Sequence, residues 1–289
     1  MKKFFENQEP LNFLGLENQS PKKAKVWILP VPYEGTVFHL SGTKEGPLAV
    51  ILASRCIELY DEETQKDLSE IGIFTLPFLN PSKNSSKEAM GNIKNAVFEI
   101  LKRKKFPVIL GGEHLITFGT VLAFEKFFGK NFSVLQFDAH CDLRNEFEGT
   151  KYSHATFTRR IVGDLKIKVC QVGIRSLSKE EAKFLEKQKL VKTFFKKNYN
   201  LKEILEFLDE KIYLTIDLDC LNPSIMPAVG TPEPEGLFFE EMVNLIKEIS
   251  KKKKILGFDV VELSPIPGFF APNYIAAKLV SKIINLTFL

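Results

Sequence analysis

The sequence predicts an α/β protein in which helices cover both faces of a mostly parallel β-sheet. Eight short apolar or β-branched segments recur along the 289 residues, with helical patterns between them. Several of these segments are apolar on both faces, which is typical of parallel strands buried between two helical layers. No repeat, low-complexity tract or linker rich in Gly, Ser or Pro interrupts the pattern. We therefore expect one doubly wound domain over residues 1–289.

The strands and helices are placed by their apolar patterns. Strands are expected at 24–31, 73–79, 107–112, 132–138, 167–174, 191–195, 212–219 and 255–263. Helices are expected at 46–63, 85–105, 176–188, 200–210 and 238–254. Ser178 stands three residues before Glu181, the spacing of a capping box. The four lysines at 251–254 are interpreted as a solvated helix end rather than as a phosphate or membrane patch.

The amino-acid composition argues against nucleic acid and membrane as partners of the protein. Apolar residues make up 44% and charged residues 26%, which is ordinary for a globular protein. The net charge of +4 comes from 40 basic and 36 acidic residues scattered along the chain, which argues against a nucleic-acid surface. The amino terminus has no apolar run long enough for a signal peptide, and no segment approaches ~18 uninterrupted apolar residues. We expect a cytoplasmic protein with no membrane partner.

The four cysteines predict free thiols. Cys56, Cys141, Cys170 and Cys220 contain no CxxC pair, which argues against a disulfide scaffold or a structural zinc site. Cys141 and Cys220 both lie inside acidic motifs, a placement compatible with their two thiols lying close together in the fold. A disulfide between them is not expected in a reducing cytosol.

Polar clusters follow four of the expected strands directly. "GGEH" follows "PVIL", "DAHCD" follows "SVLQF", "DLDCLNP" follows "YLTI", and "ELSP" follows "GFDVV". In an open parallel sheet, ligands gather at the carboxyl ends of the strands. The sequence therefore predicts a site where four strands direct carboxylates and imidazoles to one edge of the sheet.

The residue types in these clusters predict a metal site. Imidazole and carboxylate ligands without a thiolate suit a first-row divalent cation such as Mn²⁺. Six candidate ligands carry more carboxylate charge than one ion needs, and the pairs spaced by two can supply bridging and terminal ligands to two ions. A lone Asp is more often a cap and a lone His is usually just hydrogen-bonded, but two of the four histidines lie in these clusters and a third follows in "YSHA". The candidates are His114, Asp138, His140, Asp142, Asp217 and Asp219.

The same motifs carry a family resemblance. "GGEH", "DAHCDLR", "YSHATFTRR", "TIDLDCLNPSIMPAVGTPEPEGL" and "FDVVELSP" together resemble the ureohydrolase family of arginases and agmatinases. "PYEGTVFHLSGTKEGPLAVILAS" is similar to the amino-terminal pattern of agmatinases, and the resemblance runs from about Pro30 to about Pro265. It implies a three-layer α/β/α fold around a central, mostly parallel eight-stranded sheet, two Mn²⁺ ions, and assembly into trimers or hexamers.

Position by position, the resemblance implies two overlapping ligand sets. The first ion would be held by His114, Asp138, Asp142 and Asp217. The second would be held by Asp138, His140, Asp217 and Asp219. Asp138 and Asp217 would then bridge the two ions.

The resemblance also assigns catalytic roles. His154 matches the family's catalytic histidine, which moves protons and assists the departing amine, and Glu262 matches the acid that grips the guanidinium group. Asp142 is predicted to be catalytic as well as a ligand. A water shared by two cations would attack the guanidinium carbon, and the amine must leave protonated. Urea and a free amine result.

The other end of the substrate is predicted from one loop. "LRNEFEGTKYSHA" lacks the Ser/Asn-rich stretch with which arginases bind an α-carboxylate. Glu146 and Glu148 would attract a distal ammonium, although solvated loop charges are an equal interpretation. Arg144 would instead hold a carboxylate such as that of guanidinobutyrate, or would only pair with the nearby acids. We order the substrates as agmatine, which yields urea and putrescine, then aminopropylagmatine, then guanidinobutyrate, with arginine last. Thr231 and Glu262 complete the predicted substrate contacts.

Three positions depart from the family pattern. Asn222, Glu235 and Ala155 stand where aspartate, glycine and glycine are common. None is a predicted metal ligand, so the departures bear on loop shape and substrate choice.

Two other classes of protein are less well supported by the sequence. A dinuclear phosphoesterase lacks support because no phosphate loop is present and Glu262 would repel a phosphate. A catalytically silent homologue would be expected to lose a ligand, and none is lost.

Overall fold

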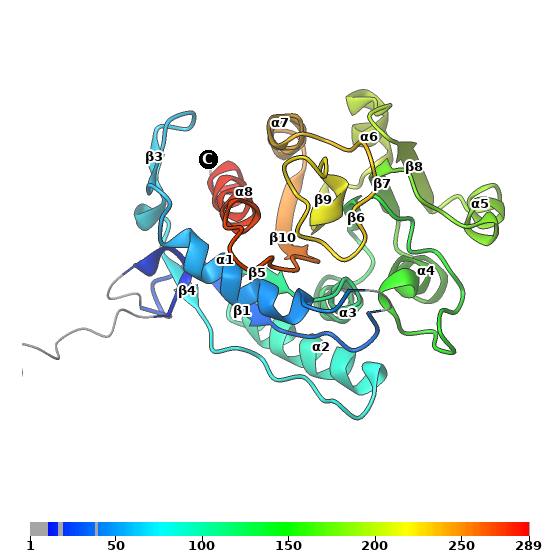
Figure 1. Cartoon of the computed structure of the whole chain (residues 1–289), viewed down its shortest axis with the longest axis horizontal. Helices are drawn as coiled ribbons and strands as arrows, with labels where there is room; N and C mark the ends of the chain where they lie inside the picture. Colours follow the sequence, from blue (N-terminus) through cyan, green and yellow to red (C-terminus); the bar gives the residue numbers. More distant parts are fainter. Residues whose placement is uncertain (1–10, 17–19, 38–39, 289) are drawn as a thin grey trace, which may run out of the picture.

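A parallel sheet forms the centre of the molecule. A computed structural model describes residues 11–16, 20–37 and 40–288. His39, for which the sequence predicts a surface position or one at the mouth of the site, lies outside these residues. Its eight main strands are all parallel and are ordered β4-β1-β5-β10-β9-β6-β7-β8 (Figure 1). The strands are β1 Val26–Val31, β4 Ile73–Thr75, β5 Phe106–Gly111, β6 Ser133–Phe137, β7 Val169–Ile174, β8 Val191–Phe195, β9 Lys211–Asp217 and β10 Lys254–Val261.

Each of the eight predicted strands is present. The largest difference is in the segment predicted at 73–79, where β4 ends at Thr75. The chain still runs beside β1 beyond that point, because Leu76 and Leu79 donate their backbone N–H groups to Ile28 and Pro30. The two donors are three residues apart while their acceptors on β1 are two apart, so the regular ladder is interrupted, and Pro77 lies within the interruption.

Helices cover both faces of the sheet and give the three-layer architecture. One buried apolar cluster lies between the sheet and α1, α6, α7 and α8, and the other lies between the opposite face and α2, α3 and α4. Phe184 and Leu185 of α5 pack against the second cluster. The helices are α1 Gly46–Ser54, α2 Ser86–Lys102, α3 Ile116–Phe128, α4 Phe157–Arg160, α5 Lys179–Leu185, α6 Leu201–Phe207, α7 Phe239–Ser250 and α8 Ala271–Thr287.

The first predicted helix, 46–63, is too long. The helix α1 ends at Ser54, whose hydroxyl donates to the Ile51 carbonyl and accepts from the backbone N–H of Leu14. The chain then forms a small antiparallel hairpin of β2 Tyr60–Asp61 and β3 Lys66–Asp67, which was not predicted. The hairpin is tied to α8 because Asp61 lies 2.7 Å from the buried Nζ of Lys282.

Two long helices, α3 and α8, were missing from the sequence interpretation. Most residues of α3 are buried, and α8 is buried along almost its whole second half. A helix that is apolar on most sides gives no clear amphipathic period.

The predicted capping box at the start of α5 is confirmed, since the Ser178 side chain accepts from the Glu181 N–H and the Glu181 side chain accepts from the Ser178 N–H. No helix within the described ranges is long and apolar enough to cross a bilayer.

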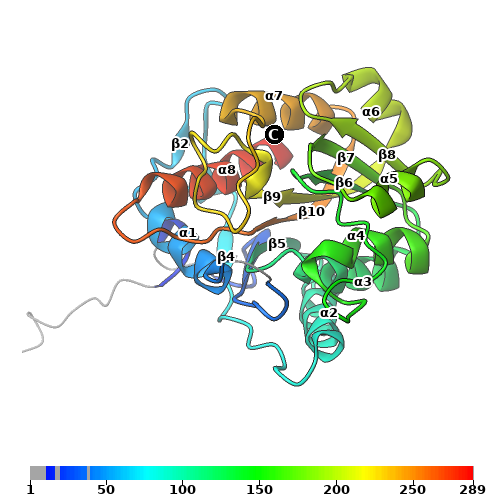
Figure 2. The ribbon, with the colours of Figure 1, turned by 45° about the vertical axis from the view of Figure 1, so that its right-hand side comes forward.

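The carboxyl ends of three neighbouring strands, β1, β5 and β10, meet around a glycine. Gly112, directly after β5, donates its N–H to Val31 and accepts from the N–H of Glu262 after β10. A Cβ at Gly112 would lie 2.1 Å from the backbone oxygen of Tyr33. The loops after β1, β5 and β10 therefore pack backbone against backbone, which fixes the edge on which the polar motifs lie. Figure 2 shows these strands between α7 and α8 above and α2 and α3 below.

We expect Gly112→Ala to destabilise the protein strongly, because the neighbour that must move is backbone. The loss should be about 3 kcal/mol or more, the range of an overpacked buried site. Gly91→Ala is the matched control, since Gly91 lies within α2 and an added Cβ meets nothing within 4 Å. That variant should gain up to about 1 kcal/mol from helix propensity. Denaturant unfolding measures both, and equal stabilities of the two variants would contradict the close-packing account.

Candidate active site

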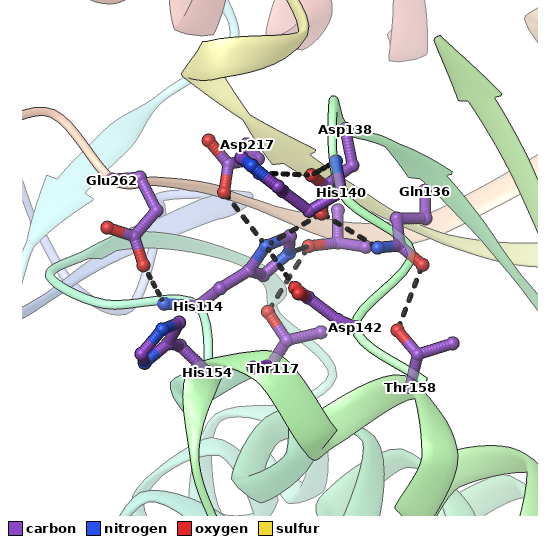
Figure 3. A network of polar contacts seen from close by, with 12 residues as sticks. His114, Thr117, Gln136, Asp138, His140, Asp142, His154, Thr158, Asp217 and Glu262 are labelled. Carbon is purple, nitrogen blue, oxygen red and sulfur yellow. Dashed lines mark hydrogen bonds and ion pairs between the residues drawn. The ribbon is translucent and has the colours of Figure 1, made fainter. Parts of the chain in front are cut away.

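The six predicted metal ligands converge at the carboxyl edge of the sheet. The Nδ1 of His114, after β5, lies 3.1 Å from Asp138 Oδ2 and 3.1 Å from Asp217 Oδ2. Asp142 Oδ2 is 3.6 Å from the same nitrogen. Figure 3 shows these side chains directed toward one another from the ends of separate strands.

A second group forms beside the first. The Nδ1 of His140 lies 2.8 Å from Asp219 Oδ2 and 3.8 Å from Asp138 Oδ1. His114, Asp138 and Asp217 can offer ligand atoms within 4.8 Å of one another, and so can Asp138, His140 and Asp219. Asp138 belongs to both groups, which is the arrangement expected of a bridging carboxylate.

Local backbone structure holds these carboxylates. Asp138 Oδ1 accepts the N–H of His140 at 2.6 Å, and Asp217 Oδ1 accepts the N–H of Asp219 at 2.9 Å. The two motifs therefore fold alike, as turns closed by an aspartate two residues earlier. Asp142 and Glu262 have left-handed backbone conformations, with φ of 51° and 66°. Such a conformation is unusual for a glutamate, and backbone strain of this kind concentrates at functional sites.

The electrostatics of the cluster match a cation site. Burial and the neighbouring carboxylates raise the pKa values of Asp138, Asp142 and Asp217. Burial opposes the charging of His114, but the surrounding aspartates outweigh it and raise its pKa to about 9. The same balance raises the pKa of His140 to about 11. Without cations, these side chains keep protons because their pKa values are raised. Divalent metal ions can replace those protons, so the carboxylate and imidazole groups of the cluster fit a metal site.

A buried polar network fixes the orientation of His114. Its Nε2 lies 2.8 Å from Thr215 Oγ1, and that hydroxyl donates to Asp259 at 2.6 Å. Because the only proton of Thr215 is used, the hydroxyl accepts from His114 Nε2–H, and Nδ1 is left to face the aspartates. Asp259 also accepts from Thr117 and Tyr213. Such partners orient the ligands of metal sites.

A second network orients the shared carboxylate. Gln136 donates to Asp138 Oδ2 at 2.8 Å, and its Oε1 accepts from Thr158 and Gln171 (Figure 3). Sequence reasoning missed Gln136 and Asp259. The available signal was a polar residue within an otherwise apolar buried strand.

A cavity of about 300 Å³ opens beside the ligand cluster. The three predicted catalytic residues, Asp142, His154 and Glu262, all line it. Glu262 accepts the backbone N–H of His114 at 2.6 Å, and burial raises its pKa to about 8. Burial lowers the pKa of His154 to about 4, so this imidazole is neutral at physiological pH.

The predicted specificity residues occupy different positions. Arg144 and Thr231 line the cavity. Glu146 and Glu148 are exposed and do not line the cavity. They flank Phe147 in the sequence, and Phe147 does line it. The Arg144 guanidinium lies 5.3 Å from the centre of the Phe147 ring.

The loop that carries Asp219 is held by an arginine that sequence reasoning also missed. Arg175, after β7, donates to the backbone oxygens of Asp219, Glu233 and Pro234 at 2.7–3.0 Å. Glu235 has a φ of 67°, which explains why glycine is common at this position.

The other departures are accommodated locally. Asn222 Oδ1 accepts the N–H of Ser224 at 2.9 Å, a role that an aspartate would fill equally. Ala155 is buried and lines the cavity. All four cysteines are free thiols, with Cys141 and Cys220 both buried.

Comparison with known proteins places the chain in a family. The sequence profile of the arginase family matches residues 24–285. The N(1)-aminopropylagmatine ureohydrolase of Synechocystis is 34% identical over 91% of this chain and 89% of its own length. The agmatinase of Pyrococcus horikoshii is 31% identical over 92% of this chain and 93% of its own. The agmatine ureohydrolase structure of Thermoplasma volcanium superposes with a TM-score of 0.84 at 30% identity, covering 94% of this chain and 92% of that one.

The protonated cluster predicts how the metal-free protein responds to pH. The pKa of His114 is raised from 6.5 to about 9, so its contribution to stability is complete below pH 6.5 and is lost as the pH rises through 9. The raised pKa values of His140 and the three aspartates act in the same direction. The melting temperature of metal-free protein should therefore fall between these pH values. Mn²⁺-loaded protein should fall less, and a flat metal-free profile would contradict the protonated cluster.

Proposed function

The chain belongs to the arginase family of ureohydrolases, and on that premise we propose that it releases urea from agmatine and leaves putrescine. The observation that carries the proposal is the shared cavity, where the two Asp/His groups, Glu262 and His154 meet. A guanidinium carbon held by a carboxylate beside a cation cluster is suited to hydrolysis.

N(1)-aminopropylagmatine is the second candidate substrate. It carries the same guanidinium group and a longer amine-bearing chain. Relatives named for its hydrolysis are 34–36% identical to this chain, compared with 31% for the Pyrococcus agmatinase. Both candidates are alkylguanidines with a distal cation, so the chemistry at the guanidinium end is the same.

Mn²⁺ is the cofactor that we propose, at two ions per chain. His114, Asp138, Asp142 and Asp217 would hold one ion, and Asp138, His140, Asp217 and Asp219 would hold the other. When bound, the ions would supply an acidified water as nucleophile at neutral pH. The carboxylate-rich donor set with two imidazoles supports Mn²⁺ over softer metals.

Glu262 binds and orients the substrate in this account. A guanidinium and a carboxylate can form two parallel N–H···O bonds, which fix the plane of the guanidinium. Arrival of this cation would offset the burial that raises the pKa of Glu262. The left-handed backbone at Glu262 and its bond to the His114 N–H hold the carboxylate at the ligand cluster.

His154 carries the proton that the departing amine needs. An amide anion is too basic to leave, so the nitrogen must be protonated as the C–N bond breaks. A neutral imidazole can take a proton from the attacking water and return one to the amine.

From the family resemblance we further propose that the protein is a cytoplasmic homo-oligomer, either a trimer or a hexamer.

The proposed activity is tested by urea release from four compounds with Mn²⁺ present. Agmatine and aminopropylagmatine should give higher kcat/KM than guanidinobutyrate, and arginine should be the poorest substrate. Absence of urea from all four would contradict the proposal, and a preference for arginine would contradict the substrate assignment.

Single substitutions should separate catalysis from metal binding. His154→Ala should lower kcat by ~10²–10⁴, the contribution of a general acid or base, while the metal content stays unchanged. Asp138→Ala should instead reduce the metal content, because Asp138 belongs to both ligand groups. Elemental analysis of both purified variants measures this. Metal loss in the His154 variant would identify it as a ligand rather than a proton carrier.

The loop acids should act on the distal ammonium through solvent. Changing both Glu146 and Glu148 to Gln should reduce the preference for agmatine over guanidinobutyrate about two- to fivefold, the effect of exposed charge contacts worth ~0.2–1 kcal/mol. The effect should shrink at high salt. Arg144→Ala is the counter-test and should lower kcat/KM for guanidinobutyrate only. Unchanged discrimination in the double variant would refute the role of these acids.

A further inference from the structure

Glu113 is a buried carboxylate beside the site that neither ligand group uses. It follows β5, immediately before His114, and its side chain points to the loop after β1. Its Oε2 accepts the backbone N–H groups of Gly35 and Thr36 at 2.7 and 2.6 Å, and its Oε1 accepts the Thr36 hydroxyl at 2.7 Å. Glu113 therefore fixes both the backbone and the side chain of Thr36.

The Thr36 hydroxyl lies between Glu113 and His154. Its oxygen accepts the backbone N–H of His154 at 3.2 Å and lies 3.4 Å from the Nδ1 of the same residue. Burial raises the pKa of Glu113 to about 7, and in its ionised form this carboxylate accepts the one proton of the Thr36 hydroxyl. The oxygen can then only accept from His154, which requires the proton of the neutral ring to be on Nδ1.

We propose that Thr36 is a positioning residue, which holds His154 with its proton on Nδ1 so that Nε2 is the nitrogen that exchanges protons with the substrate. The inference rests on the proposed function, because it specifies how His154 performs the proton transfer assigned to it. A histidine of the wrong tautomer would offer the departing amine or the attacking water the wrong partner.

The surroundings of His154 support a neutral ring with one fixed tautomer. Burial lowers its pKa, a backbone hydrogen bond with Thr36 opposes this in part, and the charges of His140, His114 and Arg144 lower the pKa further. The edge of the ring packs against Phe147, with ring centres 5.5 Å apart. Phe147 can restrain the ring orientation but cannot select the tautomer. Among the described residues, Thr36 is the only hydrogen-bond partner of the ring, through its hydroxyl and through its backbone.

The structure permits a clean test, because the loop does not depend on the hydroxyl. The backbone N–H groups of Gly35 and Thr36 still bind Glu113 when the Thr36 side chain is replaced. Thr36→Val keeps the shape of the side chain and removes the hydroxyl, and Thr36→Ser restores it. Thr43→Val is the matched control, since Thr43 is a buried threonine whose hydroxyl has no partner among the described residues.

The experiment compares kcat and KM for urea release from the best substrate of the wild type, using Mn²⁺-loaded protein. Thr36→Val should lower kcat about 10- to 100-fold, part of the contribution of a general acid or base, and should leave KM within about twofold. Thr36→Ser should recover most of kcat, and Thr43→Val should match the wild type. Metal content should be equal in all four proteins. If Thr36→Val does not fold, Thr36→Ala carries the same test.

Three results would overturn the inference. The first is wild-type kcat in Thr36→Val. The second is a Thr36→Ser variant as slow as Thr36→Val, which would indicate packing rather than hydrogen bonding. The third is a loss confined to KM. Failure of the proposed function is distinguishable from these results, because the wild-type protein itself would then release no urea.

Discussion

The repulsion among four buried aspartates is the constraint on which the rest of the structure depends. Asp138, Asp142, Asp217 and Asp219 lie at one edge of the sheet within reach of two imidazoles. Such a cluster is unstable unless protons or cations neutralise it. Parallel strands bring the residues together because all carboxyl ends lie at the same edge, and the central position of β5, β10, β9 and β6 removes that edge from bulk water.

The polar residues behind the cluster serve the same constraint. Asp259 and Gln136 are fully buried, and each is satisfied by several partners. They determine which atoms of His114 and Asp138 face the other members of the cluster. Glu113 has the same role in the loop after β1, where it accepts from the Thr36 hydroxyl, whose oxygen in turn contacts His154. A site built of buried charges thus requires a surrounding layer of residues that fixes each hydrogen-bond direction.

The sequence was sufficient to predict the strands and the convergence of the ligands, because both follow from local patterns and from the geometry of parallel sheets. It did not reveal α3 and α8, since a buried helix gives no amphipathic period. The roles of Asp259 and Gln136 were also missed, because a polar residue inside an apolar strand acquires its meaning only from residues on other strands. The left-handed backbone at Glu262 and Glu235 likewise depends on tertiary packing that overrides residue preference.

The central claim is that the cluster is a two-cation site with Asp138 in both ligand sets. Calorimetric titration of the metal-free protein with Mn²⁺, combined with elemental analysis at saturation, tests it most directly. The account predicts two ions per chain, and it predicts that Asp138→Ala weakens both binding events. Saturation at one ion in active protein, or an Asp138→Ala variant that still binds two ions with unchanged affinity, would contradict it.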